Sequence, residues 1–168
     1  VVSVSPLQMA EVTSEIANGG YHVQPHIVRA IHKTNDTWLI THPEKTKIGW
    51  VNEKDLDIVK SAMRKVVTEG TARWYANIKG IQIAGKTGTA QNPHGNDHAW
   101  FISFAPYKHP RIAMAVLVEN AGFGSASAVP ISTLLIEKYL TGKVEQKQLF
   151  KRMVNFKPDK YDTTGSEE

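Results

Sequence analysis

Small and apolar residues recur at helical spacing near the start of the chain, and the residues around them mark where a helix begins and ends. Ser5 can cap this helix, Pro6 suits its first turn, and Gln8 completes a capping box with Ser5. Gly19 and Gly20 can close it. The positions at helical spacing are Leu7, Ala10, Ser14 and Ala17. The pattern predicts a first helix.

Two later segments show the same periodicity. We expect residues 52–71 to form a helix that Asn52 caps and Gly70 ends, and residues 129–140 to form a helix that Gly142 ends. The apolar stripe of the longer helix is predicted to contain Leu56, Val59, Met63, Val66 and Val67.

Short apolar runs bounded by polar turns predict strands elsewhere. Residues 21–31 and 37–50 are expected to be extended segments of a small hairpin. Consecutive strands are predicted further along the chain, over residues 78–91, 98–106 and 111–120. Residues 107–110 have the length of a hairpin turn between the last two strands. Helices followed by consecutive strands and a last helix favour an α+β fold, an antiparallel sheet with helices packed on it.

A sheet of three strands is narrow, and its exposed edges are unusual for a chain of 168 residues. The sequence also starts without methionine, so we expect part of the fold to lie outside this chain. Residues 1–142 are expected to form the folded part, with residues 121–127 as a flexible Gly/Ser loop. Residues 143–168 are predicted to be a polar, frayed C-terminal extension.

The composition is typical of a globular domain and removes several kinds of site. Hydrophobic residues make up 41% of the chain and charged residues 21%. The absence of cysteine excludes disulfides, thiolate metal sites and a cysteine nucleophile. The net charge of +4 comes without a basic run interleaved with aromatic residues, so no nucleic-acid partner is expected.

The segment AGKTGTAQ, residues 84–91, places a cation, two hydroxyls and a glycine along one predicted strand. Gly88 has no side chain, so an extended peptide can approach this strand and hydrogen-bond to its edge. Thr87 and Thr89 can donate to an anion, and Lys86 adds positive charge. The backbone N–H of Thr89 can form one arm of an oxyanion hole. These groups suit a peptide with a free carboxylate; the alternative is an ordinary turn with a surface lysine.

Other candidate groups carry weaker signals. His94 and His98 fit no standard metal-ligand spacing, so no metal is expected. The segment GFGSAS lacks the lysine of a phosphate-binding loop and is expected to border a cleft. The aromatic residues of the second predicted strand are expected to be core and cleft wall rather than a stacking platform; they are Trp100, Phe101 and Phe104.

Lys-Thr-Gly is one of the motifs shared by serine β-lactamases and penicillin-binding proteins. Over residues 3–141 the chain resembles the C-terminal part of the transpeptidase domain of class B penicillin-binding proteins. Within that family it is most similar to the elongation-type penicillin-binding protein 2. The segments that carry the resemblance occur in the family's order and are SVSPLQMAEVTSEIANGG, VVTEGTA, IAGKTGTAQ, HAWFISFAP and IAMAVLVEN.

The resemblance implies an antiparallel sheet with helices on both faces, the fold of penicillin-binding proteins and serine β-lactamases, of which this chain is the C-terminal portion. It also implies acyl transfer on peptidoglycan stem peptides that end in D-Ala-D-Ala, through a serine acyl-enzyme that penicillins trap. It implies that Lys86 sets the protonation of a serine–lysine network and is catalytic. Thr87, Gly88 and Thr89 would bind substrate, with the two hydroxyls on its terminal carboxylate. The backbone N–H of Thr89 would be an oxyanion donor. No cofactor is implied.

The family's other two motifs are missing from this sequence. No serine is followed by lysine in an S-x-x-K pattern; the nearest match is SAMR, Ser61 to Arg64, and arginine does not act as a base. No S-x-N occurs, and TND at residues 34–36 is a weak counterpart in the wrong place. We therefore expect this chain to supply one wall of an active site, and to be inactive by itself.

Two alternatives remain open, a non-catalytic penicillin-binding-like sensor or scaffold and a serine β-lactamase. For the transpeptidase hypothesis, the resemblance implies partners beyond stem peptides and β-lactams. These are the N-terminal remainder of the same protein, a membrane glycosyltransferase and the rod-shape complex. It places the domain on the outer side of the bacterial inner membrane, in the periplasm, through an anchor outside this chain.

Overall fold

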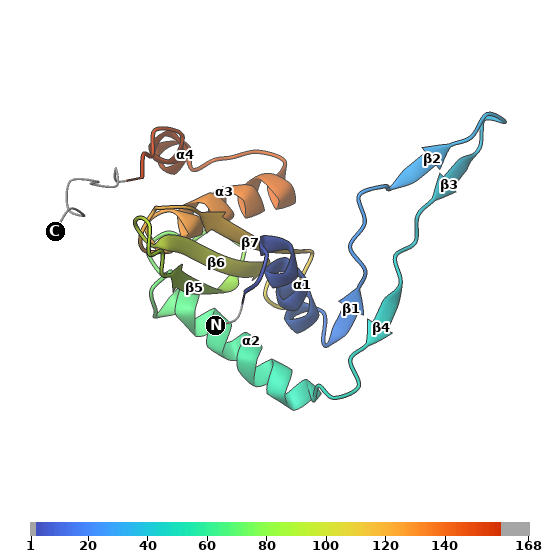
Figure 1. Cartoon of the computed structure of the whole chain (residues 1–168), viewed down its shortest axis with the longest axis horizontal. Helices are drawn as coiled ribbons and strands as arrows, with labels where there is room; N and C mark the ends of the chain where they lie inside the picture. Colours follow the sequence, from blue (N-terminus) through green and yellow to red (C-terminus); the bar gives the residue numbers. More distant parts are fainter. Residues whose placement is uncertain (1–2, 159–168) are drawn as a thin grey trace.

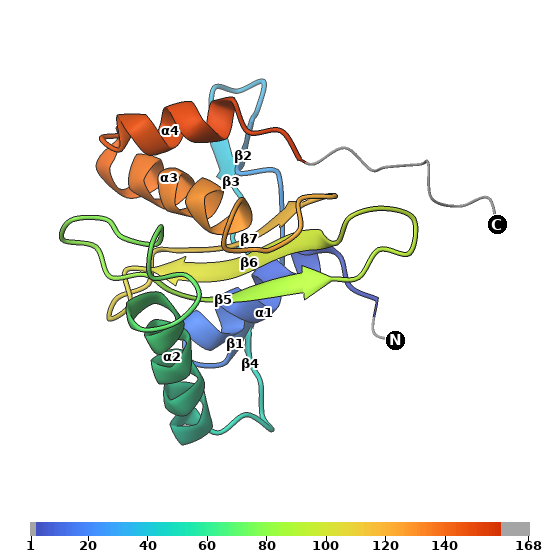
Figure 2. The same ribbon diagram turned by 90° about the vertical axis from the view of Figure 1, so that its left-hand side faces the viewer.

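The computed structural model describes residues 3–158. Its centre is an antiparallel sheet in the order β5-β6-β7, formed by β5 (Ala84–Ala90), β6 (His98–Ala105) and β7 (Ile112–Val118). Helices α3 (Ala128–Thr141) and α4 (Lys147–Val154) lie on one side of this sheet, and α1 (Pro6–Ala17) lies on the other (Figure 2). Helix α2 (Glu53–Thr68) packs beside β5. The predicted α+β class and antiparallel sheet are confirmed.

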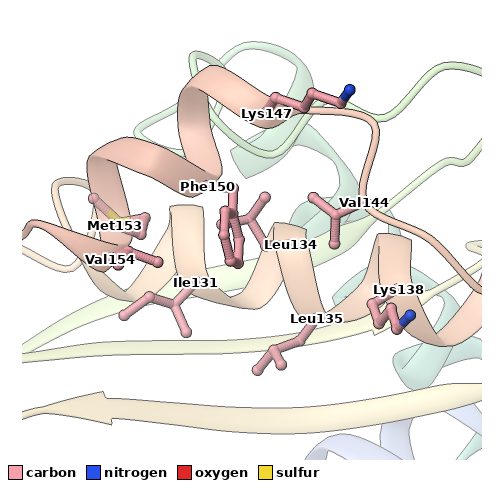
Figure 3. Close-up of a pocket in the computed structure, with 9 residues that line it drawn as sticks. All are labelled: Ile131, Leu134, Leu135, Lys138, Val144, Lys147, Phe150, Met153 and Val154. Carbon is pink, nitrogen blue, oxygen red and sulfur yellow. The ribbon is translucent and has the colours of Figure 1, made fainter.

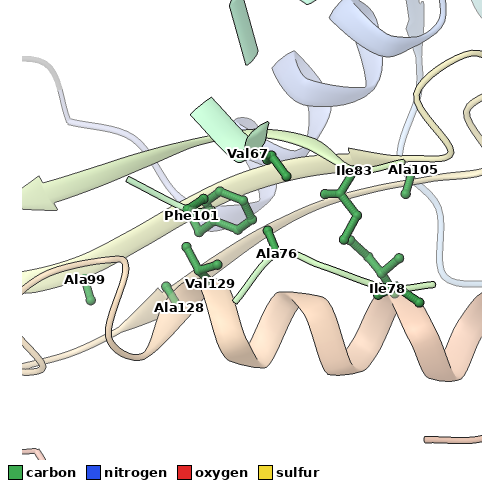
Figure 4. Packing of buried hydrophobic residues seen from close by; sticks show 11 residues of the cluster. Val67, Ala76, Ile78, Ile83, Ala99, Phe101, Ala105, Ala128 and Val129 are labelled. Carbon is green, nitrogen blue, oxygen red and sulfur yellow. The ribbon is translucent and has the colours of Figure 1, made fainter. Parts of the chain in front are cut away.

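Strand β6 divides its side chains between two hydrophobic clusters, because successive residues of a strand point to opposite faces. Phe101 is fully buried and packs with Val129 of α3 and Ile83 just before β5 (Figure 4). Phe104 points to the other face, in a cluster with Ala17 of α1. Strand β5 is thus held between β6 and α2, with its remaining edge unpaired by any described strand.

The predicted helix starts are confirmed. The Ser5 hydroxyl accepts from the backbone N–H of Gln8 at 3.3 Å, and the Gln8 side chain accepts from the Ser5 N–H at 2.8 Å. The Asn52 side chain accepts from the N–H of Lys54 at 2.9 Å and caps α2. Gly142 ends α3 with φ of 80°, a conformation that favours glycine.

The predicted faces of these helices are only partly correct. Leu56, Met63 and Val67 of α2 are buried, whereas Val59 from the same predicted stripe is 40% exposed. In α1 the buried residues are Thr13 and Ala17, and Leu7 is 59% exposed. Both exposed residues lie on helix surfaces that no described element covers.

The predicted small hairpin is a long arm that projects from the helices and the central sheet (Figure 1). At its base β1 (Tyr21–Val23) pairs with β4 (Lys45–Lys47), and further out β2 (Ala30–His32) pairs with β3 (Trp38–Ile40). The Lys47 amine donates to the carbonyl of Gly19 at 2.7 Å, which ties the base of the arm to the end of α1.

Two segments differ from the sequence-based prediction. The strand predicted over residues 78–91 begins only at Ala84. Residues 147–154, predicted as frayed, form the amphipathic helix α4. Phe150 of α4 and Leu134 of α3 face a largely apolar cavity of about 610 Å³ between the two helices (Figure 3). The proposed boundary at residue 142 stays a prediction, and residues 1–2 and 159–168 lie outside the described part.

Within residues 3–158, the helices are too short or too polar to cross a lipid bilayer.

Candidate functional site

The motif residues lie on β5, the strand at one edge of the central sheet. Lys86 and Thr89 are exposed, and Thr87 and Gly88 are half-buried. Strand alternation puts Lys86 and Gly88 on one face and the two threonines on the other. The structure therefore presents the motif along an accessible strand edge, as the sequence analysis requires.

The Lys86 side chain bends back along its own strand. Its amine donates to the carbonyl oxygen of Thr87 at 2.5 Å. Among residues 3–158 no carboxylate forms an ion pair with it. An exposed ammonium group without a carboxylate partner can turn toward an anion or a hydroxyl that approaches the strand edge.

Thr71 is a residue of this site that sequence reasoning missed. It lies in the turn after α2, and its hydroxyl is 2.7 Å from the hydroxyl of Thr87. Either hydroxyl can be the donor, so the pair leaves hydrogen-bonding capacity for an incoming anion. The signal was present in the segment VVTEGTA, which leads from α2 toward β5, but nothing in it singled out Thr71.

Two glycines allow close packing at the motif strand: Gly88 against β6, and Gly124 where a loop contacts the strand. A Cβ on Gly88 would lie 3.2 Å from the Cβ of Trp100 on β6, a tight contact. A Cβ on Gly124 would lie 2.9 Å from the carbonyl oxygen of Gly88 and would clash with that of Trp100. Thus the glycine-rich loop of residues 121–127 packs directly on the backbone beside the motif, where the sequence analysis placed a cleft border.

The other sequence candidates are structural or peripheral. Phe101 and Phe104 are fully buried core residues, and Trp100 is half-buried against Gly88. The Nδ1 atom of His98 accepts from the backbone N–H of Asn120 at 3.1 Å. In the part of the chain that is described, no three His, Asp or Glu side chains gather as a metal site would require.

Residues 2–137 match the family model described as the penicillin binding protein transpeptidase domain. This chain belongs to that family. The sequence-based recognition is therefore confirmed for the family, and the relatives described next confirm it for the class B branch.

Relatives of this transpeptidase-family chain are named as enzymes. It is 37% identical over 156 residues to the peptidoglycan D,D-transpeptidase PbpA of Mycobacterium tuberculosis, covering 84% of this chain and 30% of that protein. It is 38% identical over 143 residues to the peptidoglycan D,D-transpeptidase MrdA of Acinetobacter baumannii, covering 75% and 21%.

The structure agrees with these similarities. A ceftriaxone acyl-enzyme complex of penicillin-binding protein A from M. tuberculosis superimposes with a TM-score of 0.74 at 35% identity. That match covers 83% of this chain and 33% of the other. Pseudomonas aeruginosa PBP2 superimposes with a TM-score of 0.63 at 33% identity, covering 86% and 32%. This member of the transpeptidase family thus spans between about a fifth and a third of the length of these relatives.

The SAMR segment of this transpeptidase-family chain has a structural role. Ser61 is exposed on α2, and Arg64 donates from Nη1 to the carbonyl oxygen of the buried Ile83 at 2.6 Å. Partial burial lowers the pKa of the Arg64 guanidinium, which the Coulombic interaction with Tyr107 offsets in part. Arg64 therefore anchors the start of β5 to α2.

Replacing Arg64 by methionine should reduce the free energy of unfolding by about 2 kcal/mol, because a buried carbonyl loses a charged donor while the apolar stem stays. Urea denaturation of this chain, purified with and without the substitution, would measure the change in the free energy of unfolding. Lys65→Met, at the exposed neighbouring position, is the matched control and should change the free energy of unfolding by less than about 0.5 kcal/mol. Equal effects of the two substitutions would contradict the anchoring role.

Proposed function

We propose that this chain is the C-terminal part of the transpeptidase domain of a peptidoglycan D,D-transpeptidase of the elongation type. The longer protein cross-links stem peptides ending in D-Ala-D-Ala through a serine acyl-enzyme, and penicillins acylate the same serine. Lys86 sets the protonation of the reacting network. Thr87 and Thr89 hold the terminal carboxylate, and the N–H of Thr89 contributes to the oxyanion hole.

The observation that carries this proposal is the Lys-Thr-Gly-Thr segment on an accessible edge strand, in a chain of the penicillin-binding protein transpeptidase family. An edge strand can pair with an extended peptide, and a glycine in it allows close approach. Structures of M. tuberculosis penicillin-binding protein A with ceftriaxone, imipenem and penicillin G are described as acyl-enzyme complexes. These relatives support the proposed β-lactam binding.

The catalytic serine is proposed to lie in the remainder of the longer protein. This sequence contains no S-x-x-K and no S-x-N, and the chain corresponds to about a third of its relatives. Exposed apolar side chains on α1 and α2 support the same conclusion; they include Leu7, Val12, Ile58 and Val59. A neighbouring half-domain would cover such surfaces. By itself the chain is expected to form no acyl-enzyme.

The family also suggests where the longer protein works. We propose that it lies on the outer side of the bacterial inner membrane, in the periplasm, held by an anchor outside this chain. Its proposed partners are peptidoglycan stem peptides, a membrane glycosyltransferase and the rod-shape complex. From the same family we propose that the longer protein acts in cell shape and is an antibiotic target.

Fluorescent-penicillin labelling of this chain and of the longer protein, side by side, tests the proposal. Label on the longer protein alone is the expected result. Label on neither would favour a non-catalytic scaffold, and label on this chain would mean that a serine within it is the nucleophile. Rapid release of the label, with hydrolysis of a chromogenic cephalosporin, would instead indicate a β-lactamase.

Replacing Thr87 by valine in the longer protein should lower the efficiency of penicillin acylation about tenfold, because one donor to the ligand carboxylate is lost while the shape is kept. The loss should lie in the dissociation constant of the initial complex rather than in the acylation rate constant. Stopped-flow acylation kinetics separate the two. Thr141→Val, at the far end of α3, is the control. Unchanged binding in Thr87→Val would place the carboxylate site elsewhere.

A further inference from the structure

Two loops flank the motif strand and are tied together by hydrogen bonds. The β5–β6 loop covers residues 91–97, and the β7–α3 loop covers residues 119–127. The Asn92 side-chain amide donates from Nδ2 to Oδ1 of Asn120 at 2.8 Å, across 28 positions of sequence. The N–H of Gly122 donates to the carbonyl of Asp97, also at 2.8 Å. Neither bond is needed for the sheet itself, so both serve to hold one loop against the other.

The Asn92–Asn120 pair has little room around it. A Cβ on Gly95 would lie 2.5 Å from Oδ1 of Asn120 and 2.9 Å from Nδ2 of Asn92. The other end of the Asn92 amide, Oδ1, accepts from the N–H of His94 at 3.1 Å. Both ends of this side chain are therefore engaged, and the turn of the first loop is built around it.

Asn120 adopts φ of 54°, a left-handed conformation that few residues other than glycine tolerate. Its backbone N–H donates to Nδ1 of His98, at the start of β6. Asparagine is well suited to this conformation and also supplies the acceptor for Asn92. The position thus combines an unusual backbone with a specific side-chain contact.

These loops border the exposed end of the motif. A cavity of about 520 Å³ is lined by Thr89, by Asp97 of the first loop and by Gly122 and Phe123 of the second. Phe123 is 75% exposed, so its side chain lies at the opening of this cavity rather than in the core. Asn92 follows Thr89 by three positions, and a shift of the first loop would therefore move the end of β5.

We infer that Asn92 and Asn120 are positioning residues for Thr89. Their side-chain hydrogen bond fixes the two loops relative to each other, and so fixes the cavity wall where the ligand carboxylate is held. This inference rests on the proposed function, which assigns the carboxylate to Thr89. The two asparagine side chains act on the ligand indirectly, through Thr89 and the loop backbone. It contributes by pre-organising the site, since small displacements of binding groups are costly for catalysis.

Two substitutions of Asn120 in the longer protein separate the side-chain contact from the backbone conformation. Asn120→Gly removes the acceptor and suits the left-handed backbone, so it breaks the link without strain. Asn120→Asp keeps an oxygen for the Asn92 amide and also tolerates this conformation. Penicillin acylation kinetics should show an acylation efficiency about tenfold lower for Asn120→Gly and within about twofold of the unsubstituted protein for Asn120→Asp. The midpoint of thermal unfolding should change by less than about 2 °C in both.

A double substitution gives a second readout. Because both residues act through one bond, Asn92→Ala combined with Asn120→Gly should be no slower than the slower single variant. Three results would each overturn the positioning role. They are full acylation efficiency in Asn120→Gly, equal losses of efficiency in Asn120→Gly and Asn120→Asp, and additive losses in the double variant. If the unsubstituted longer protein takes no label, the proposed function itself fails and this role with it. If the unsubstituted longer protein is labelled and Asn120→Gly is acylated with the same efficiency, only the positioning role is refuted.

Discussion

Replacing Lys86 by alanine in the longer protein should slow acylation by penicillin by about 10²–10³-fold. Under the proposed function, the substitution removes a positive charge beside the reacting groups. Within residues 3–158 the Lys86 amine donates to the carbonyl oxygen of Thr87 and forms no ion pair with a carboxylate. Its loss should therefore leave the fold intact, and the effect should lie in the rate constant of acylation.

The matched control for this prediction is Lys108→Ala. Lys108 is an exposed lysine in the turn between β6 and β7, so its replacement by alanine removes the same charge at a distance from the motif. Stopped-flow measurements with fluorescent penicillin should give near-normal rates for Lys108→Ala. If Lys86→Ala also reacts at a near-normal rate, Lys86 has no part in the chemistry, and the motif acts through its threonines alone.

The sequence predicted best those features that local chemistry decides. The capping box of Ser5 and Gln8 and the left-handed Gly142 involve residues within one turn of each other, so their partners can be identified from spacing. The β6–β7 pairing follows from a short turn between two apolar runs. The motif strand was also predicted correctly, although its first residues were not.

Features that depend on contacts between distant residues were missed. Thr71 meets Thr87 across 16 positions and Asn92 meets Asn120 across 28, and no periodicity in the sequence reports such pairs. Helical spacing predicted that Val59 lies on an apolar stripe, but not whether another element covers it. Helix α4 was missed because lysine, arginine and glutamine make up half of its short sequence, and its apolar residues gain a partner only once α3 is in place.

Replacing Gly124 by alanine should reduce the free energy of unfolding by about 3 kcal/mol, at the upper end of the usual cost of overpacking. The new methyl group would clash with the carbonyl oxygen of Trp100 and lie 2.9 Å from that of Gly88. Both oxygens belong to paired strands, so neither can move aside as a flexible side chain would. The loop must instead lift from β5, which should also slow acylation in the longer protein.

Gly49→Ala is the control for this substitution, because a Cβ at Gly49 would meet no atom within 4 Å. We expect it to change the free energy of unfolding by less than about 1 kcal/mol. Urea denaturation of the two variants gives the comparison, and penicillin labelling of the longer protein gives the functional one. Equal stability of the two variants would mean that residues 121–127 leave β5 at little cost. A loop held so weakly could not set the position of Thr89, and both the contact of Gly124 with Gly88 and the role of Asn120 would then need another explanation.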